Sequence, residues 1–196
     1  MTERKDKQDI YAVVLAAGLA ERFGSTKQLA EFKGSTLVRR AVDLAAEACG
    51  NRYVLVVGHD WRAVSDACMP LTGFIVYNDS YADGIGSSIA RATSAIGHVA
   101  RAIVVLLADQ PLISATHLHE LCDAWTGAGN EIVATDYAGT LGVPALFGNS
   151  CFDDLAALAG DTGARRLLTS GKYRVHGIPF EPAAVDIDTP ADLEKL

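Results

Sequence analysis

Two basic side chains, Arg22 and Lys27, lie in a glycine-containing segment that directly follows the apolar run at residues 10–16. Small residues at positions 16–18 allow backbone N–H groups to approach an anion closely, and the two cations would neutralise it. These residue types suit a polyphosphate ligand. The alternative is a simple glycine turn with a solvated arginine and lysine, and residue types alone do not separate the two. The glycine spacing fits neither GxGxxG nor GxxxxGK followed by Ser or Thr.

An aspartate, Asp109, follows the strongest strand pattern in the chain, the apolar run at residues 101–108. A carboxylate at the end of such a strand points into the crevice beyond the sheet, where it can hold Mg²⁺. The alternative is that Asp109 caps the following helix, although Ser114 is better placed for that role.

Two further acids, Asp186 and Asp188, lie at the end of residues 184–187, a segment that we expect to form a last strand. Side chains alternate across a strand, so only one of the two carboxylates would face the crevice, and the alternation leaves open which one. Thr189 and Pro190 are typical of a helix N-cap and first helical residue, so a terminal helix is expected there.

A polar, glycine-containing segment at residues 78–88 could contact a base, a ribose or a phosphate, but a capped helix start at Ser87 explains the same residues. The five histidines and four cysteines form no HExxH, CxxC or similar ligand spacing, and no GxSxG is present. Zinc chemistry and covalent nucleophilic catalysis are therefore disfavoured, and we expect the cysteines to be free thiols in or near the core.

Short apolar runs alternate with helical spacings along the chain. The predicted strands are residues 10–16, 52–58, 73–77, 101–108, 131–135, 143–147, 173–178 and 184–187. Helices are predicted at residues 36–49, 87–96, 114–124, 151–158 and 162–169, with a short one ending near 69 and a long loop at 17–35. This order predicts an α/β fold, a mostly parallel sheet with helices on both faces. The candidate segments all follow strands and should meet beyond the carboxyl ends of the sheet.

The composition limits the classes of protein to which the chain can belong. The chain has 196 residues with 49% hydrophobic and 21% charged content, which predicts a single globular domain over residues 10–196 after a charged tail at 1–9. A net charge of −7 disfavours binding to nucleic acid or to an anionic membrane. No apolar run approaches the roughly 20 residues of a membrane helix and the N-terminus does not read as a signal peptide, so a cytoplasmic location is expected.

Three motifs in order, LAAG-x3-R-F-G-x2-KQL, LADQP and DIDTPADL, resemble those of the small nucleotidyltransferases. The middle motifs NDxYAxGxGSS, GVPALF and GDTGARRLL, at residues 78–88, 142–147 and 160–168, make the chain most similar to the molybdenum cofactor cytidylyltransferases. The resemblance extends from about residue 10 to the end. Phe23 and Ala30 stand where the family usually has Met and Leu, and both changes keep an apolar side chain.

The resemblance implies a Rossmann-like nucleotidyltransferase fold and a Mg²⁺-dependent transfer of CMP from CTP to the phosphate of molybdopterin, with release of pyrophosphate. It implies catalytic roles for Arg22, Lys27 and Asp109, with the two cations on the triphosphate and Asp109 and Asp188 holding the metal. The other implied nucleotide-binding residues are Leu15, Ala16, Ala17, Gly18, Gly58, Asn78, Gly84 and Ser88, and the implied acceptor-binding residues are Gly142 and Pro144. Ala17 resembles the CTP users, because guanylyl-transferring relatives tend to have LAGG.

The residues agree with this chemistry, since an ionised phosphate acceptor needs no protein base and no histidine is positioned as one. Alternatives remain: use of GTP, a sugar or polyol phosphate as acceptor, or a non-catalytic nucleotide- or cofactor-binding chaperone for a recipient molybdoenzyme. The presence of Lys27 and Asp109 favours the enzyme over the chaperone. An NAD-dependent oxidoreductase is weakened by the missing GxGxxG.

Overall fold

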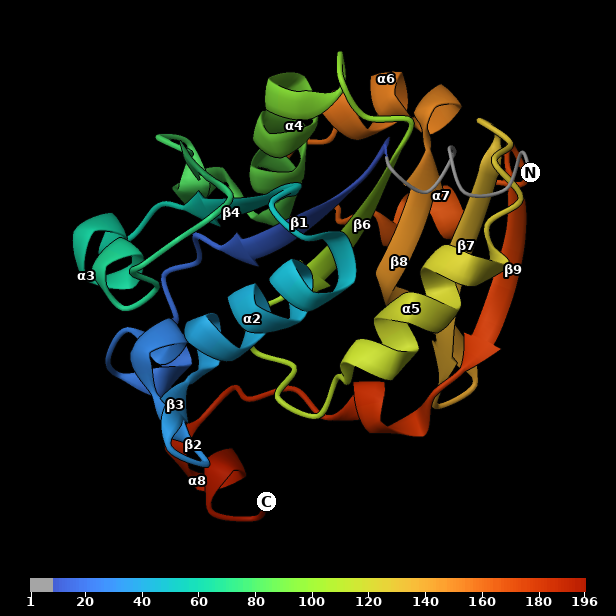
Figure 1. The fold of residues 1–196 in the computed structure, drawn as a ribbon. Coiled ribbons are helices and arrows are strands. Elements are labelled where there is room, and N and C mark those ends of the chain that lie inside the picture. The colour runs from blue at the N-terminus through green and yellow to red at the C-terminus, as the bar shows by residue number, and fades with distance from the viewer. Residues whose placement is uncertain (1–8) are drawn as a thin grey trace.

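A seven-stranded sheet forms the centre of the protein in the computed structural model, which describes residues 9–196 (Figure 1). Its strand order is β5-β4-β1-β6-β8-β7-β9, and only β8 runs against the others. The strands are β1 (Ile10–Ala16), β4 (Tyr53–Val57), β5 (Phe74–Tyr77), β6 (Ala102–Leu107), β7 (Glu131–Tyr137), β8 (Thr140–Gly148) and β9 (Arg174–Pro179). The predicted mostly parallel α/β sheet is confirmed.

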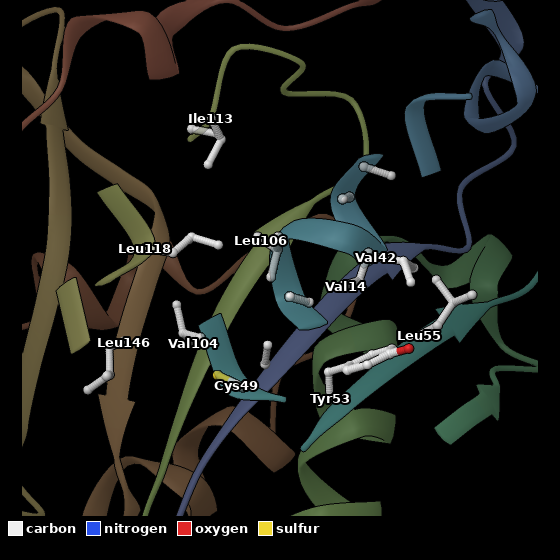
Figure 2. Packing of buried hydrophobic residues seen from close by; sticks show 14 of the residues in the cluster. Val14, Val42, Cys49, Tyr53, Leu55, Val104, Leu106, Ile113, Leu118 and Leu146 are labelled. Carbon is white, nitrogen blue, oxygen red and sulfur yellow. The ribbon is translucent and has the colours of Figure 1, made fainter. Parts of the chain in front are cut away.

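Helices cover both faces of this sheet, as predicted (Figure 1). One face carries α2 (Leu37–Cys49), α3 (Trp61–Asp66) and α5 (Ala115–Ala124), and the other carries α4 (Ile85–Ile96), α6 (Phe152–Ala156) and α7 (Arg165–Leu168). Figure 2 shows the first core, where Val42 and Cys49 of α2 lie over strand residues such as Val14 and Val104. The central strands are buried on both faces because their residues alternate between the two cores. All four cysteines lie within the described residues, are buried and form no disulfide, as expected.

The helix ends follow the local signals in two cases and depart from them in a third. Thr36 accepts a hydrogen bond from the Arg39 N–H at the start of α2, and Ser114 accepts one from His117 N–H at the start of α5. The predicted start at Ser87 is wrong, because α4 already begins at Ile85. The Ser87 hydroxyl instead donates to backbone carbonyl oxygens of the preceding turn, the 3₁₀ segment η4 (Tyr81–Asp83) with its flanks.

The expected strand at 184–187 is also wrong. The chain forms the 3₁₀ turn η6 (Glu181–Ala184) and then an extended segment that leaves the sheet (Figure 1). Ile187 is fully buried against Phe32 and Leu37, and its N–H donates to the carbonyl of Asp109 at 2.9 Å. Burial of this one side chain therefore places the segment across the end of β6. The short helix α8 (Pro190–Leu193) follows, with Thr189 and Asp192 forming a capping box.

The predicted loop at 17–35 contains short elements that the sequence pattern did not indicate. These are the 3₁₀ turns η2 (Glu21–Phe23) and η3 (Lys27–Leu29) and the hairpin of β2 (Glu31–Phe32) with β3 (Ser35–Thr36). Similarly, the residues between the predicted strands 131–135 and 143–147 form a tight hairpin of β7 with β8, and the 3₁₀ turn η5 (Asn149–Cys151) follows β8. Strands and 3₁₀ turns of only two or three residues are too short to give a periodic pattern of apolar residues in the sequence.

The division into a tail at 1–9 and one domain over 10–196 stays a prediction, because residues 1–8 lie outside the described part of the chain. Within residues 9–196, no helix combines the length and apolar character needed to cross a membrane.

Candidate active site

A cleft of about 480 Å³ lies beyond the carboxyl ends of the central strands β1 and β6. Segments far apart in the sequence meet in it, as expected for a parallel sheet. Its lining residues are Leu15, Ala17, Gly18, Leu19, Ala20, Lys27, Gln28, Tyr81, Ala82, Gly84, Ile85, Ser88, Leu107, Asp109 and Asp161.

The loop after β1 is held at both ends by hydrogen bonds. The Ala17 carbonyl accepts from His59 N–H at 3.1 Å, and the buried Gln28 amide donates to the Gly18 carbonyl at 3.0 Å. Ala20 adopts a left-handed conformation with φ 53°, which turns the chain into η2. Ala16 belongs to the core rather than to the cleft, whereas Ala17 and Gly18 line the cleft.

Lys27 lies between two of the predicted carboxylates. Its Nζ is 2.7 Å from Asp109 Oδ2 and 3.4 Å from Asp188 Oδ1, and its side chain is only 12% exposed. Arg22, by contrast, is 75% exposed and places Nη2 3.1 Å from Asp188 Oδ2. The structure thus brings together the four charged residues to which the family resemblance gives roles, from the β1 loop, the end of β6 and the C-terminal segment.

The contacts of Asp186 and Asp188 differ. Asp188 pairs with both basic side chains, while Asp186 lies near Asp109 and Gln110 and remains exposed. Partial desolvation and the neighbouring Asp109 carboxylate raise the pKa of Asp186 to about 6. Asp186 therefore carries charge near the site without contributing to the lysine pairs.

The carboxylates fit a divalent cation. Asp109 Oδ1 is buried and has no hydrogen-bond partner among residues 9–196, and carboxylate oxygens are the ligands that Mg²⁺ prefers. Within the same residues, no group of three or more His, Cys, Asp or Glu side chains is arranged to hold a metal. A cation bound at Asp109 and Asp188 would complete its coordination with substrate phosphate oxygens and water, which is usual for Mg²⁺.

The predicted nucleoside residues divide between the cleft and its support. Ser88 and Gly84 line the cleft. Asn78 is buried behind it, where its amide donates to Ser87 Oγ at 2.9 Å and Ser88 Oγ at 3.0 Å. Asn78 therefore fixes the start of α4 instead of facing the cleft. Gly58 lines a separate open hollow of about 360 Å³ beside α3.

The predicted acceptor residues lie around a smaller hollow of about 150 Å³, which shares Leu15, Ile85 and Leu107 with the cleft. Gly142 lines this hollow. Pro144 is buried beneath, and its carbonyl accepts from Thr135 Oγ1 at 2.6 Å. The remaining lining residues are Ile89, Val105, Tyr137, Val143, Gly163, Ala164, Arg165 and Leu168.

Several residues of these hollows were not singled out from the sequence as site residues. Among residues 9–196, Arg165 is the only Lys or Arg side chain lining the smaller hollow, and its Nη2 donates to Thr140 Oγ1 at 2.6 Å. It belongs to the GDTGARRLL motif, which marked the segment but not this side chain. The position of Gln28 directly after Lys27 is a signal that could have identified it. The positions of Tyr81 and Asp161 in the cleft depend instead on long-range packing.

Comparison with known proteins gives a family and several relatives. Residues 12–175 match the MobA-like NTP transferase domain. The chain is 30% identical to the purine catabolism protein PucB of Bacillus subtilis (strain 168), covering 95% of each protein. It is 28% identical to nicotine blue oxidoreductase of Paenarthrobacter nicotinovorans, covering 95% of this chain and 96% of that protein. It is 23% identical to molybdenum cofactor cytidylyltransferase of Escherichia coli (strain K12), covering 93% of each.

Two solved structures are similar over almost their whole length. One is a homologue of Mycobacterium tuberculosis Rv0371c from Mycobacterium sp. strain JC1, with a TM-score of 0.83, 30% identity and coverage of 96% of this chain and 94% of that one. The other is Rv0371c of M. tuberculosis H37Rv in complex with manganese, with a TM-score of 0.78, 30% identity and coverage of 96% and 97%.

We expect Gly58→Ala to destabilise the fold, because a Cβ at this position would lie 2.5 Å from Tyr81 Cβ and 2.8 Å from the Ala17 carbonyl oxygen. Overpacking of this kind costs about 1–3 kcal/mol of unfolding free energy, which urea denaturation would measure. Gly163→Ala is the matched control, since its Cβ would meet Ile85 Cγ2 at an ordinary 3.5 Å. Equal stability of the two variants would contradict the packing argument.

Proposed function

This chain belongs to the MobA-like NTP transferase family and is a nucleotidyltransferase, and on that premise we propose that it transfers CMP from CTP to the phosphate of molybdopterin. The observation that carries the proposal is the pairing of Lys27 and Arg22 with Asp109 and Asp188 at the ends of β1 and β6. The relative in E. coli named molybdenum cofactor cytidylyltransferase supports this acceptor, and Ala17 in the LAAG motif supports CTP.

In this proposal the triphosphate of CTP binds along the loop after β1. Lys27 and Arg22 contact its oxygens, and Ala17 and Gly18 admit it close to the backbone. Asp109 and Asp188 are the residues that would hold Mg²⁺, which neutralises charge on the triphosphate when bound. Ser88 and Gly84 line the part of the cleft proposed for the nucleoside, and the buried Asn78 positions Ser88.

The reaction proposed is a displacement at the α-phosphorus of CTP. An oxygen of the acceptor's phosphate monoester forms the new bond, the bond from the α-phosphorus to the bridging oxygen breaks, and pyrophosphate leaves with the electron pair. The acceptor is already ionised near pH 7, so no protein base is required. Lys27 and Arg22 stabilise the negative charge on the departing pyrophosphate, and the rest of the catalysis is positioning of the two phosphates.

The acceptor would occupy the smaller hollow, which adjoins the cleft through Leu15, Ile85 and Leu107. The hollow is mainly apolar, with Tyr137 and Arg165 as its polar side chains, and this lining suits a flat heterocycle that carries polar or anionic groups. Gly142 leaves room beside Tyr137, because a Cβ there would collide with the phenol ring. Pro144 does not line the hollow. It is buried in β8, and we propose that it contributes only to the shape of the strand there.

A nucleotide panel tests the proposed function most simply. With molybdopterin as acceptor, we expect pyrophosphate release from CTP to exceed that from GTP, ATP and UTP, and the pterin product to carry CMP. Asp109→Asn serves as the inactive control, with an expected loss of about 10²–10³-fold in kcat, the size seen when a group that stabilises developing charge is removed. A preference for GTP, or turnover only with a sugar or polyol phosphate, would show that the substrates differ from those proposed. Tight CTP binding without turnover on any of these acceptors would favour a chaperone.

For the acceptor hollow, we expect Arg165→Gln to raise KM for molybdopterin about tenfold or more while KM for CTP changes less than twofold. The reason is the loss of a charge-assisted hydrogen bond, which contributes roughly 1.5–3 kcal/mol. Arg166→Gln is the matched control, because this neighbouring arginine is exposed and does not line the hollow. A larger effect on KM for CTP than on KM for the acceptor would contradict this placement.

A further inference from the structure

Three of the four carboxylate oxygens proposed to bind a divalent cation are in contact with basic side chains of the same chain. Lys27 Nζ contacts Asp109 Oδ2 and Asp188 Oδ1, and Arg22 Nη2 contacts Asp188 Oδ2. Only Asp109 Oδ1 has no hydrogen-bond partner among residues 9–196. The lysine ammonium thus lies between the two carboxylates, in the position where a metal bridging them would compete with it.

The charges of Asp109 and Asp188 are balanced without a metal by those of Lys27 and Arg22. Asp186 nearby leaves one carboxylate in excess, so the net attraction on a divalent ion is smaller than three carboxylates alone would exert. The lysine side chain is 12% exposed, so water screens its pairs less than those of a surface lysine. A divalent ion that binds the free protein must therefore break an enclosed ion pair before it gains both carboxylates.

A triphosphate would change this balance. It brings several negative charges to the loop that carries Arg22 and Lys27, and both side chains are long enough to move from a carboxylate to a phosphate while their backbone stays in place. The backbone around Lys27 is held independently, by Thr26 donating to Asp60 and by Gln28 donating to the Gly18 carbonyl. Movement of the side chain alone would then expose Asp109 and Asp188 to a cation.

We propose that Lys27 acts as an internal counter-ion that blocks the divalent-cation site until a nucleotide triphosphate draws it away. The inference rests on the proposed function, because it takes the triphosphate as the ligand of Lys27. It goes further in assigning a binding order: the free protein binds a divalent ion weakly, and nucleotide and metal bind with positive coupling. The coupling is reciprocal, so the metal raises nucleotide affinity by the same factor.

The test measures Mn²⁺ binding to the full chain without nucleotide or acceptor, by electron paramagnetic resonance of the free ion. We expect Lys27→Met to bind Mn²⁺ about tenfold more tightly than the unmodified protein, a factor within the usual range of coupling between ligands. Lys172→Met is the matched control: it removes the same charge from an exposed pair with Asp154, also at 2.7 Å, and should leave Mn²⁺ affinity unchanged. Adding Asp109→Asn to Lys27→Met should abolish the gain.

Equal or weaker Mn²⁺ binding by folded Lys27→Met, relative to the unmodified protein, would overturn the proposal. So would an equal gain in Lys172→Met, which would reduce the effect to net charge. Lys27→Gln repeats the test if the methionine variant does not fold. A second measurement needs no substitution: the unmodified protein should bind the preformed Mn²⁺–CTP complex at least about tenfold more tightly than Mn²⁺ alone. The Lys27→Met measurement uses no turnover, so absence of CMP transfer would count against the proposed function and leave this result interpretable.

Discussion

The enclosed ion pairs of Lys27 with Asp109 and Asp188 connect three segments that are distant in the sequence. Two carboxylates brought this close would repel each other without a cation between them. Because Lys27 is only 12% exposed, its pairs hold more strongly than surface ion pairs, which contribute little. The Lys27 ammonium therefore neutralises this repulsion at the point where the loop after β1, the end of β6 and the C-terminal segment meet.

The sheet topology makes this meeting possible. β1 and β6 are adjacent and parallel, so the segments that follow them emerge at the same edge. The C-terminal segment reaches that edge through burial of Ile187 and its hydrogen bond to the Asp109 carbonyl. The reversed strand β8 begins at this edge, which brings Gly142 beside the carboxyl end of β6. One reversed strand thus adds a second hollow to a cleft formed by parallel strands.

The sequence predicted the features that depend on local pattern. Buried strands, the cap at Ser114, and the loop carrying Arg22 and Lys27 each have a signal within about ten residues. The strand at 184–187 failed because an alternating apolar pattern does not say whether a segment pairs with a sheet or packs on side chains. Burial of Ile187 against Phe32 and Leu37 decided the outcome, and it involves residues about 150 positions away.

The sequence singled out the charged residues that meet beyond β1 and β6, but it misjudged the place of Asn78 and did not single out Arg165. Charged groups that follow strands point to a crevice, and Lys27 and Asp109 do line the cleft. Asn78 was expected to face a ligand, but a buried amide satisfies its hydrogen bonds wherever partners exist, and here these are Ser87 and Ser88. Arg165 was missed because its place beside Tyr137 depends on how α7 packs on the sheet.

A double-mutant cycle on the free energy of unfolding tests the enclosed pair of Lys27 and Asp109 most directly. The cycle compares Lys27→Met, Asp109→Asn and the double variant with the unmodified protein by urea denaturation. We expect a coupling energy of about 0.5–3 kcal/mol, the range usual for neighbouring groups in one ion-pair network. A coupling no larger than that of the exposed pair of Lys172 and Asp154 would contradict it.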